Sequence, residues 1–292
     1  SAQQTKKFWR NWVKLGPLER GEPVRLIISP AKKMREDTDS FPYHSLPRFL
    51  PQTREILAAL RAMSPAELQA LWKCSERIGE GLLKSVQVKG IFVVGEKLEQ
   101  EMARLEAMDL ERRLTPAVMA YEGIQYQYLA PGVLTQEELD YLEGHLRILS
   151  GFYGLLRPFD GVVAYRLEMG AKLSVAGKKD LYAYWGDTLA QALWEESDTV
   201  VNLASQEYSR CIAAHPKPGT RLITCIFGEV RQGKVVEKGT LCKMARGEMV
   251  RFLAERQAQS PEEMQAFDRL GYRFSPEGSD GDTYVFLQEG KP

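Results

Sequence analysis

Short apolar runs, spread over the whole chain, constrain its fold more than any other feature. Each run is rich in β-branched or aromatic residues and has the length of a strand rather than of a helix. The first spans residues 25–29 and stops at Pro30, as a buried strand would. The others span residues 91–94, 199–203, 222–227, 235–238 and 284–287. Together these runs predict a β-sheet.

Between the runs, three capping boxes mark the starts of helices. In a capping box, a Ser or Thr side chain accepts a hydrogen bond from the N–H three residues later, and a Glu at that later position bonds back to the cap. The three boxes are Ser64 with Glu67, Thr135 with Glu138, and Ser260 with Glu263. Helices are therefore interspersed with the strands without strict alternation. This order predicts an α+β fold with a mixed β-sheet flanked by helices.

The chain is long enough to form one large domain. It has 292 residues, of which 44% are apolar. We expect a single compact domain over residues 25–288. Residues 1–24 combine aromatic and basic side chains with a turn at Gly16 and Pro17, and we interpret them as an N-terminal extension, either native or arising from the start site.

The overall charge is balanced, since 39 basic residues face 39 acidic ones. No global positive field therefore draws the protein to nucleic acid or to an anionic membrane, and any site for a polyanion has to be local. Two segments, residues 145–179 and residues 231–256, each carry a net charge of +4. These segments are where the sequence favours an anion-binding surface.

Metal and redox chemistry find little support in the sequence. The four cysteines form no CxxC pair, and the three histidines stand in no dense cluster with carboxylates at ligand spacing. We therefore expect no metal and no cofactor. With no secretory leader and no apolar run near the ~20 residues that span a bilayer, we expect a cytoplasmic protein with reduced cysteines and no membrane partner.

A helical stripe followed by a glycine turn suggests a phosphate-binding motif. Leucines at positions 139, 142, 146 and 149 are spaced for one helical face, and the pattern stops at Ser150. A second apolar segment follows the turn, which consists of Gly151, Phe152, Tyr153 and Gly154. This order is similar to the helix-hairpin-helix of DNA repair proteins, and we predict such a motif within residues 136–160.

In such a motif, glycine lets the backbone approach a phosphate closely, and the N–H groups at the start of the second helix carry partial positive charge. Arg147 and Arg157 stand beside the turn and would add charged contacts. The alternative is an ordinary helical hairpin capped by glycine, because the usual motif has one residue between its glycines and this chain has Phe152 and Tyr153 there.

Three further cationic residues are candidates for a cleft. Lys32 comes just after the first predicted strand, where a side chain at a strand end faces a crevice in many folds; a solvated loop lysine is the alternative. Lys243 and Arg246 share one face of a predicted helix, and Gly247 removes bulk beside them. This arrangement suits the close approach of a phosphate.

Two segments contribute acidic candidates. Arg166 and Glu168 belong to a dense run with neither helical nor strand period, which suits a buried salt bridge or a cleft wall. Ser205 and Glu207 follow a predicted strand, where such side chains either cap the next helix or line a ligand site.

Seven motifs occur in order along the chain: SPAK at residues 29–32, LRILSGFYGLLRPFD at 146–160, YRLEMG at 165–170, YWG at 184–186, VNLASQEY at 201–208, ARG at 245–247 and GYRF at 271–274. Together they resemble the YaaA family of peroxide stress proteins across nearly the whole chain. The resemblance implies one compact domain with a helix-hairpin-helix and a positively charged cleft that binds duplex and branched DNA without known catalysis. It also implies a role in peroxide resistance, limiting free iron and protecting DNA.

The chain departs from the family's usual pattern at several positions. Ile124 stands where an Asp is common, and Met244 stands where a Lys is common. Both changes weaken any role that rests on those polar side chains.

We therefore predict a DNA-binding protein of the oxidative stress response. It would bind duplex, bubble or junction DNA mainly through phosphates and without sequence specificity, and would help to limit iron-dependent damage. The predicted DNA-binding residues are Arg147, Gly151, Phe152, Tyr153, Gly154, Arg157, Arg166, Lys243 and Arg246.

The alternative function is an enzyme that acts on nucleic acid or on a nucleotide. Lys32 or Lys243 would serve as a nucleophile beside Glu168 or Glu207, as in glycosylase and lyase chemistry. The sequence contains no complete catalytic constellation, so binding without catalysis is the primary prediction.

Overall fold

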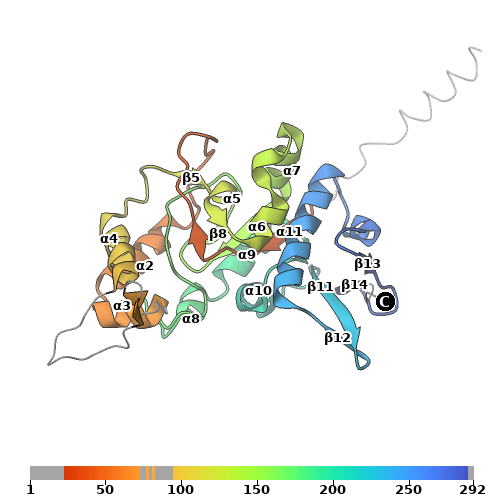
Figure 1. Cartoon of the computed structure of the whole chain (residues 1–292). Coiled ribbons are helices and arrows are strands. Elements are labelled where there is room, and N and C mark those ends of the chain that lie inside the picture. Colours follow the sequence, from red (N-terminus) through yellow and green to blue (C-terminus); the bar gives the residue numbers. More distant parts are fainter. Residues whose placement is uncertain (1–22, 73–76, 79–80, 83–94, 289–292) are drawn as a thin grey trace, which may run out of the picture.

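The first strand of the described residues is an interior strand of an eight-stranded sheet, which lies among the helices of Figure 1. The computed structural model describes residues 23–72, 77–78, 81–82 and 95–288. The strand order is β13 (Tyr272–Phe274), β14 (Thr283–Gln288), β11 (Arg221–Arg231), β10 (Thr199–Asn202), β1 (Arg25–Ile28), β7 (Leu146–Ser150) and β8 (Gly154–Leu156), and β12 (Lys234–Val236) pairs with β11.

The sheet is mixed, as predicted. β7, β1, β10, β11 and β14 run parallel to one another, whereas β8, β12 and β13 pair antiparallel with their neighbours. Ile27 of β1 stands opposite Arg147 of β7 on one side and Asn202 of β10 on the other. Because the central strands are parallel, their carboxyl ends meet at one edge of the sheet.

Helices flank the sheet. They are α2 (Leu50–Arg61), α3 (Pro65–Trp72), α4 (Glu96–Ala107), α5 (Ala117–Ala120), α6 (Ile124–Leu129), α7 (Gln136–His145), α8 (Leu181–Trp185), α9 (Thr188–Glu196), α10 (Gln206–Ala213) and α11 (Gly239–Glu255), with 3₁₀ turns η1 (Pro131–Val133) and η2 (Pro261–Ala266). Short two-residue strands make three further pairs: β2 (Lys33–Met34) with β6 (Tyr121–Glu122), β3 (Arg77–Ile78) with β4 (Gly81–Leu82), and β5 (Thr115–Pro116) with β9 (Gly161–Val162). Within the described part of the chain, no helix is long and apolar enough to cross a membrane.

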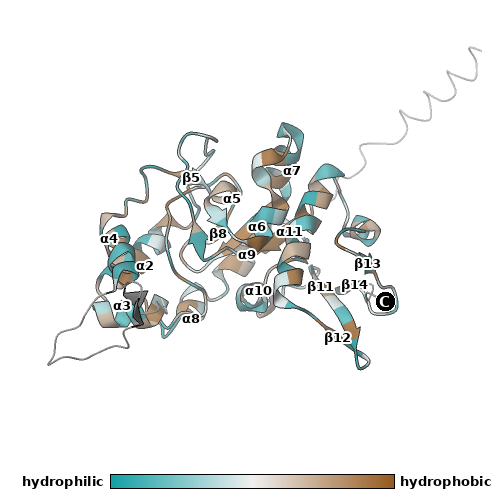
Figure 2. Cartoon of the chain, in the orientation of Figure 1, coloured by the Kyte–Doolittle hydropathy of each residue, from teal (hydrophilic) through white to brown (hydrophobic). Residues whose placement is uncertain are grey.

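The apolar character of the central strands follows from their burial. Ile27, Ile28 and Ile148 have no exposed surface, and all of β7 is buried. A strand that is covered on both faces is apolar at most positions rather than at alternate ones. The exceptions in β7 are Arg147 and Ser150, whose side chains bond Glu196 and Tyr165. Figure 2 shows the most hydrophobic residues gathered in the middle of the molecule, around α6, α9 and α11.

The capping boxes form as predicted. The Thr135 side chain accepts from the backbone of Glu138 at the start of α7, and Glu138 bonds back to Thr135. The box of Ser64 with Glu67 precedes α3. The box of Ser260 is also present, but it starts the 3₁₀ turn η2 rather than an α-helix.

Five of the predicted strands are confirmed. The runs at residues 25–29, 199–203, 222–227, 235–238 and 284–287 overlap β1, β10, β11, β12 and β14. The run at residues 91–94 lies outside the described residues, as do positions 1–22 of the predicted N-terminal extension.

The predicted helix-hairpin-helix is wrong, because a β-hairpin occupies its second half. α7 ends at His145, and the apolar residues after it form β7, which is followed by the antiparallel strand β8. The leucines at 146 and 149 fit a helical face by spacing, but they belong to a strand buried between β1 and β8. A short apolar run of this kind suits a helix and a doubly buried strand equally well.

The glycine turn is part of the core rather than a phosphate-binding surface. Phe152 and Tyr153 are buried, and their backbone N–H groups donate to the Ser150 side chain at 3.2 and 2.9 Å. Gly154 has φ +78°, and a Cβ there would press against Trp185. Glycine is therefore needed at this position for the turn and for packing.

Candidate functional site

A cleft of about 380 Å³ opens at the carboxyl ends of β1 and β10. This is the edge of a parallel sheet where α/β proteins commonly hold ligands. Its walls come from segments far apart in the sequence: residues 29–33, 71–72, 122–126 and 165–168, the start of α10 at Ser205, Glu207 and Tyr208, and Lys243 with Arg246 on α11. We call this site the cleft.

Two serines join the strand ends at the base of the cleft. The backbone N–H of Ser205 donates to Ser29 Oγ at 2.8 Å, and the two serine hydroxyls lie 3.2 Å apart. The carbonyl of Ser29 accepts from the Tyr126 hydroxyl at 2.8 Å and from Gln125 Nε2 at 3.3 Å. α6 is thereby tied to the end of β1.

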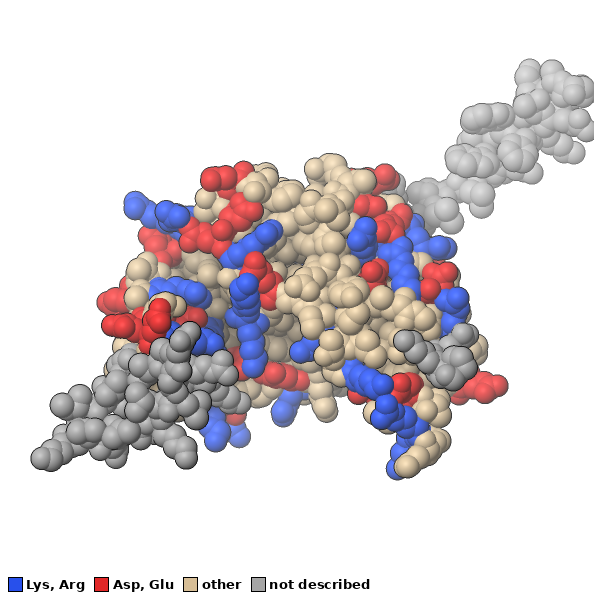
Figure 3. Space-filling view, viewed as in Figure 1, with Lys and Arg blue, Asp and Glu red and all other residues tan. Residues whose placement is uncertain are grey.

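Five cationic and three acidic side chains line the cleft, which leaves a positive excess. The cations are Lys32, Lys33, Arg166, Lys243 and Arg246, and the acids are Glu122, Glu168 and Glu207. Figure 3 shows Lys and Arg mixed with Asp and Glu over the face viewed, without a continuous positive area among the described residues. Because the whole chain has zero net charge, the positive excess of the cleft is local.

The acids in the cleft already have partners. Lys32 Nζ lies 3.0 Å from Glu168 Oε1, and Lys33 Nζ lies 2.8 Å from Glu122 Oε2. Glu207 Oε1 accepts the backbone N–H of Gly170 at 2.9 Å.

Arg166 is held against the wall of the cleft. It donates to the carbonyl of Trp72 at 2.8 Å, and the Trp72 indole donates back to the Arg166 carbonyl at 2.6 Å. Its guanidinium also lies 4.0 Å from Glu101.

Arg246 and Lys243 are less constrained. The Arg246 side chain is only 11% exposed, and its single ion pair within the described part of the chain, with Glu237, is loose at 3.8 Å. Arg246 Nε is buried and finds no hydrogen-bond partner among the described residues. Lys243 is exposed one turn earlier on α11, at the cleft.

The back of the cleft is a network of hydroxyl groups. The Tyr165 hydroxyl lies 2.6 Å from Ser150 Oγ and 2.8 Å from the Tyr121 hydroxyl. Burial raises the pKa of Tyr165 to about 12, and it raises the pKa of Tyr121 and of Tyr126 well above the ordinary value of 10. These phenols are therefore neutral hydrogen-bonding groups near neutral pH.

The structure brings seven of the residues singled out in the sequence to the cleft: Lys32, Arg166, Glu168, Ser205, Glu207, Lys243 and Arg246. Ser29 and the aromatic side chains Tyr126 and Tyr208 also line it, and residue-level reasoning did not select them. Ser29 ends the first apolar run and belongs to the SPAK motif, so its position was the available signal.

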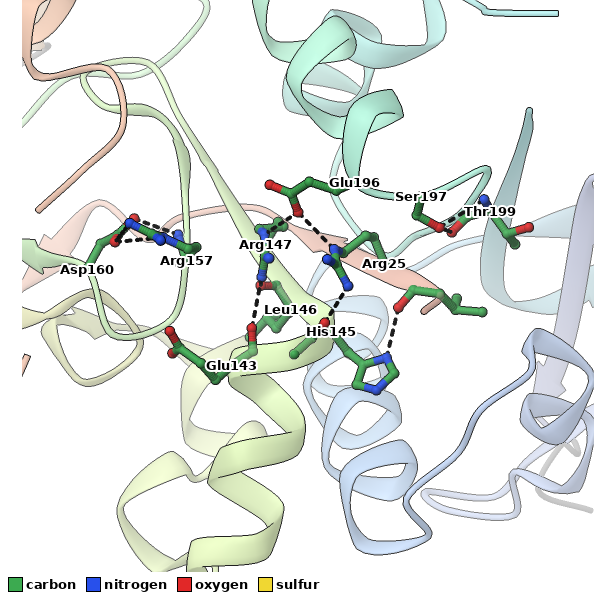
Figure 4. Close-up of polar contacts among 12 residues, drawn as sticks. Arg25, Glu143, His145, Leu146, Arg147, Arg157, Asp160, Glu196, Ser197 and Thr199 are labelled. Atoms are coloured by element: carbon green, nitrogen blue, oxygen red, sulfur yellow. Dashed lines mark hydrogen bonds and ion pairs between the residues drawn. The ribbon is translucent and has the colours of Figure 1, made fainter. Parts of the chain in front are cut away.

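Arg147 and Arg157 lie elsewhere, at the opposite end of the central strands (Figure 4). Arg147 Nε bonds Glu196 Oε2 at 2.7 Å, the same oxygen that Arg25 Nε bonds at 2.8 Å. The Arg147 side chain is 7% exposed, and burial lowers its pKa even though Glu196 opposes that shift. Arg147 thus stabilises the start of β7 and presents almost no surface to a ligand.

Arg157 belongs to a second polar cluster beside Arg147. Its side chain, 42% exposed, pairs with the buried Asp160 at 3.1 Å, and Asp160 also accepts the Arg157 backbone N–H and the Ser45 hydroxyl. Burial raises the pKa of Asp160, although these hydrogen bonds oppose the shift. Both arginines border a separate cavity of about 250 Å³.

Among the described residues, no group of three or more His, Cys, Asp or Glu side chains is arranged to hold a metal ion. Cys211, Cys225 and Cys242 are free and buried. Burial raises the pKa of Cys211 to about 11 and that of Cys225 to about 12. The described cysteines therefore lack the thiolate character of a redox centre.

Comparison with known proteins places the chain in one family. A family model described as peroxide stress protein YaaA matches residues 24–278. A UPF0246 protein of Lachnoclostridium phytofermentans is 44% identical over 91% of this chain and 96% of its own length. UPF0246 proteins of Agathobacter rectalis and Lactiplantibacillus plantarum are 46% and 44% identical, over 98% and 100% of their lengths and 90% and 91% of this chain.

Proposed function

Because the chain belongs to the peroxide stress protein YaaA family, we propose that it serves the peroxide stress response by binding DNA through the cleft. The observation that carries the proposal is the positive excess of the cleft, with Lys243 and Arg246 poorly paired inside it. The site differs from the one expected from sequence, since the glycine turn and Arg147 are buried at other places in the fold.

The binding follows from phosphate electrostatics. DNA carries closely spaced negative charges, and cationic side chains that replace condensed counterions give affinity that is independent of sequence and falls with salt. The net charge of the chain is zero, so attraction has to come from a local site, and the cleft has a positive excess. A cleft of about 380 Å³ holds a nucleotide rather than a duplex. Bubbles and junctions, which offer unpaired nucleotides, are therefore expected to bind more tightly than duplex DNA.

In the cell, this binding would take place in the cytoplasm and shield DNA from iron-dependent oxidation. The test is fluorescence anisotropy with duplex, bubble and four-way junction DNA over a salt series. Lys32→Gln with Lys243→Gln should weaken all three ligands and flatten the salt dependence. The matched control is Arg48→Gln with Arg54→Gln, which removes two exposed arginines that pair with Glu195 and Glu111 outside the cleft. Absence of binding at low salt would exclude the proposal.

A second candidate is catalysis on DNA or on a nucleotide. The observation that favours it is the meeting of Lys32 and Glu168 at 3.0 Å in the same cleft as Lys243 and Glu207. An amine beside a carboxylate is the pairing that lyases use to attack the aldehyde of an abasic site. Borohydride would trap such an adduct, so a covalent complex with abasic DNA, lost in Lys32→Gln or Lys243→Gln, would identify the enzyme.

A further inference from the structure

We propose that the inner part of the cleft binds the phosphate monoester of a nucleotide, held by Arg246 and Lys243 at the start of α10. The inference deepens the proposed function, on which it rests for the origin of the nucleotide: a terminal phosphate of DNA or a free mononucleotide. The shared chemistry is a phosphate monoester attached to a base-bearing sugar.

Arg246 is the first observation. An arginine carries five N–H donors, and a buried one normally satisfies several of them. Arg246 donates no hydrogen bond to any described residue, although only 11% of its side chain is exposed, and Glu237 lies 3.8 Å away. Its guanidinium lines the cleft. A desolvated guanidinium with free donors at a cavity is matched by an anion with several acceptor oxygens.

The start of α10 is the second observation. Ser205 occupies the N-cap position, but its side chain makes no capping hydrogen bond to the helix. The backbone N–H of Ser205 itself donates to Ser29 Oγ, and the N–H of Tyr208 bonds the Ser205 carbonyl. The first turn of α10 therefore faces the cleft, through Ser205, Glu207 and Tyr208, without the usual side-chain acceptor. Such a helix start attracts a phosphate oxygen.

The positive charge of the cleft favours a dianionic ligand over a monoanionic one. Glu168 and Glu122 pair with Lys32 and Lys33, and Arg166 lies 4.0 Å from Glu101. Lys243 and Arg246 are then the cations of the cleft that have no close acidic partner among the described residues, and Glu207 is the remaining carboxylate. A phosphate monoester carries about −1.5 to −2 charges at pH 7, whereas a phosphodiester carries one. The monoester therefore balances the two cations more completely.

The remaining surface of the cleft suits the rest of a nucleotide. Trp72, Tyr126 and Tyr208 line the same cavity and provide aromatic surface for a base. The cavity of about 380 Å³ falls within the roughly 300–1,000 Å³ range of small-molecule sites. Inorganic phosphate alone would leave this surface unused.

The test is isothermal titration of the whole chain with deoxyadenosine 5′-monophosphate, deoxyadenosine and inorganic phosphate. The monophosphate should bind about tenfold or more tightly than the nucleoside, and Arg246→Gln should remove about that factor. Arg251→Gln is the matched control on the same helix, since Arg251 pairs with Glu255 on the surface. If Arg246→Gln fails to fold, Lys243→Gln at an exposed position applies the same test.

Equal affinity for the nucleotide and the nucleoside, or undiminished binding by both cleft variants, would overturn the inference. Oligonucleotides with a 5′-phosphate or a 5′-hydroxyl separate the two origins: a gain from the 5′-phosphate assigns the site to DNA ends, and a gain only for the mononucleotide assigns it to free nucleotides. Junction DNA that binds while every monoester fails would leave the proposed function intact and reject this site. Mononucleotide binding without DNA binding would support this site and reject DNA binding as the function.

Discussion

Gly247 on α11 faces the backbone carbonyl of Gln125 on α6 so closely that a Cβ at Gly247 would overlap that oxygen. The contact sets the spacing of two helices that both border the cleft. Gln125 and Tyr126 of α6 hold the Ser29 carbonyl, and Arg246 precedes Gly247 on α11. A substitution at Gly247 should therefore affect both the stability of the fold and ligand binding in the cleft.

Gly247→Ala should separate α6 from α11 and lower the free energy of unfolding by about 1–3 kcal/mol, because the added methyl meets backbone rather than a movable side chain. Chemical denaturation measures the loss. Gly144→Ala in α7 is the control, since a Cβ there meets nothing within 4 Å. It should be neutral or slightly stabilising, because Ala is the better helix former. Equal effects of the two substitutions would contradict the packing argument.

Arg147→Met should destabilise the fold rather than act on DNA binding. It removes a buried charge from the shared oxygen of Glu196, but Arg25 still compensates that carboxylate. The loss should therefore lie near the lower end of the ~3–5 kcal/mol found when a buried pair is broken. Urea denaturation measures it.

The control for Arg147 is Arg48→Met, which breaks an exposed pair with Glu195 and should change stability by less than ~1 kcal/mol. Anisotropy on folded Arg147→Met protein should give wild-type DNA affinity. A selective loss of DNA binding with unchanged stability would instead show that Arg147 contributes to DNA binding.

Stability should fall at mildly acidic pH because of His145. Burial lowers its pKa below the ordinary value of 6.5, and Arg25 and Arg147 act in the same direction, while its hydrogen bond to the Val24 carbonyl opposes them. The unfolded chain then binds a proton before the folded one does. This part of the stability is present above about pH 6.5 and is lost as the pH falls toward the lowered pKa.

The corresponding experiment is urea denaturation of wild type and His145→Gln at pH 7.5 and pH 5. The wild type should lose more stability on acidification than the variant does. The variant also loses the stacking of His145 on Tyr141, but that loss is the same at both pH values. His215→Gln serves as the control, since His215 bonds Trp194 through its backbone carbonyl. Parallel pH profiles for wild type and His145→Gln would show that His145 does not carry the effect.

The buried cysteines should resist alkylation. In a Cys74→Ser variant, iodoacetamide at pH 7.5 should leave Cys211, Cys225 and Cys242 unmodified in the native protein and modify all three in denaturant, because burial raises all three thiol pKa values. Mass spectrometry counts the added groups. Rapid labelling of the native protein would instead indicate a reactive thiol that could react with peroxide.

Glu168→Gln should strengthen DNA binding by freeing Lys32 from its ion pair. The freed lysine adds about one phosphate contact, so the plot of log affinity against log salt should steepen by roughly 0.9. Glu195→Gln, which removes an exposed acid outside the cleft, should leave the slope unchanged. A weaker complex with Glu168→Gln would indicate that the carboxylate itself serves the ligand.

The sequence was informative wherever a local signal had one structural meaning. Capping boxes at Ser64 and Thr135 and the apolar run that became β1 were of this kind. The segment 146–156 was not, because a run buried on both faces has no period that separates strand from helix. Only its pairing with β1, more than a hundred residues earlier in the chain, makes it a strand.

The same limit applies to the cleft. Lys32 and Glu168 were selected from their segments of the chain and Lys243 from a helix face, but the distance between them depends on parallel strand order, which no local pattern encodes. Charge alone could not distinguish a cleft arginine from a structural one. Arg246 borders the cleft, whereas Arg147 forms a buried ion pair with Glu196. The difference lies in burial and in partners from other elements.

The central place of β1 also governs how the chain is made. Ile27 pairs with Asn202, so the middle of the sheet stays incomplete until both have left the ribosome. At ~5–20 residues per second, the ribosome needs roughly 10–35 s between these two positions. During that time a strand whose isoleucines are buried in the finished protein lacks one of its two neighbouring strands. Synthesis of this protein therefore includes an interval in which β1 is exposed on the side that β10 covers in the finished sheet.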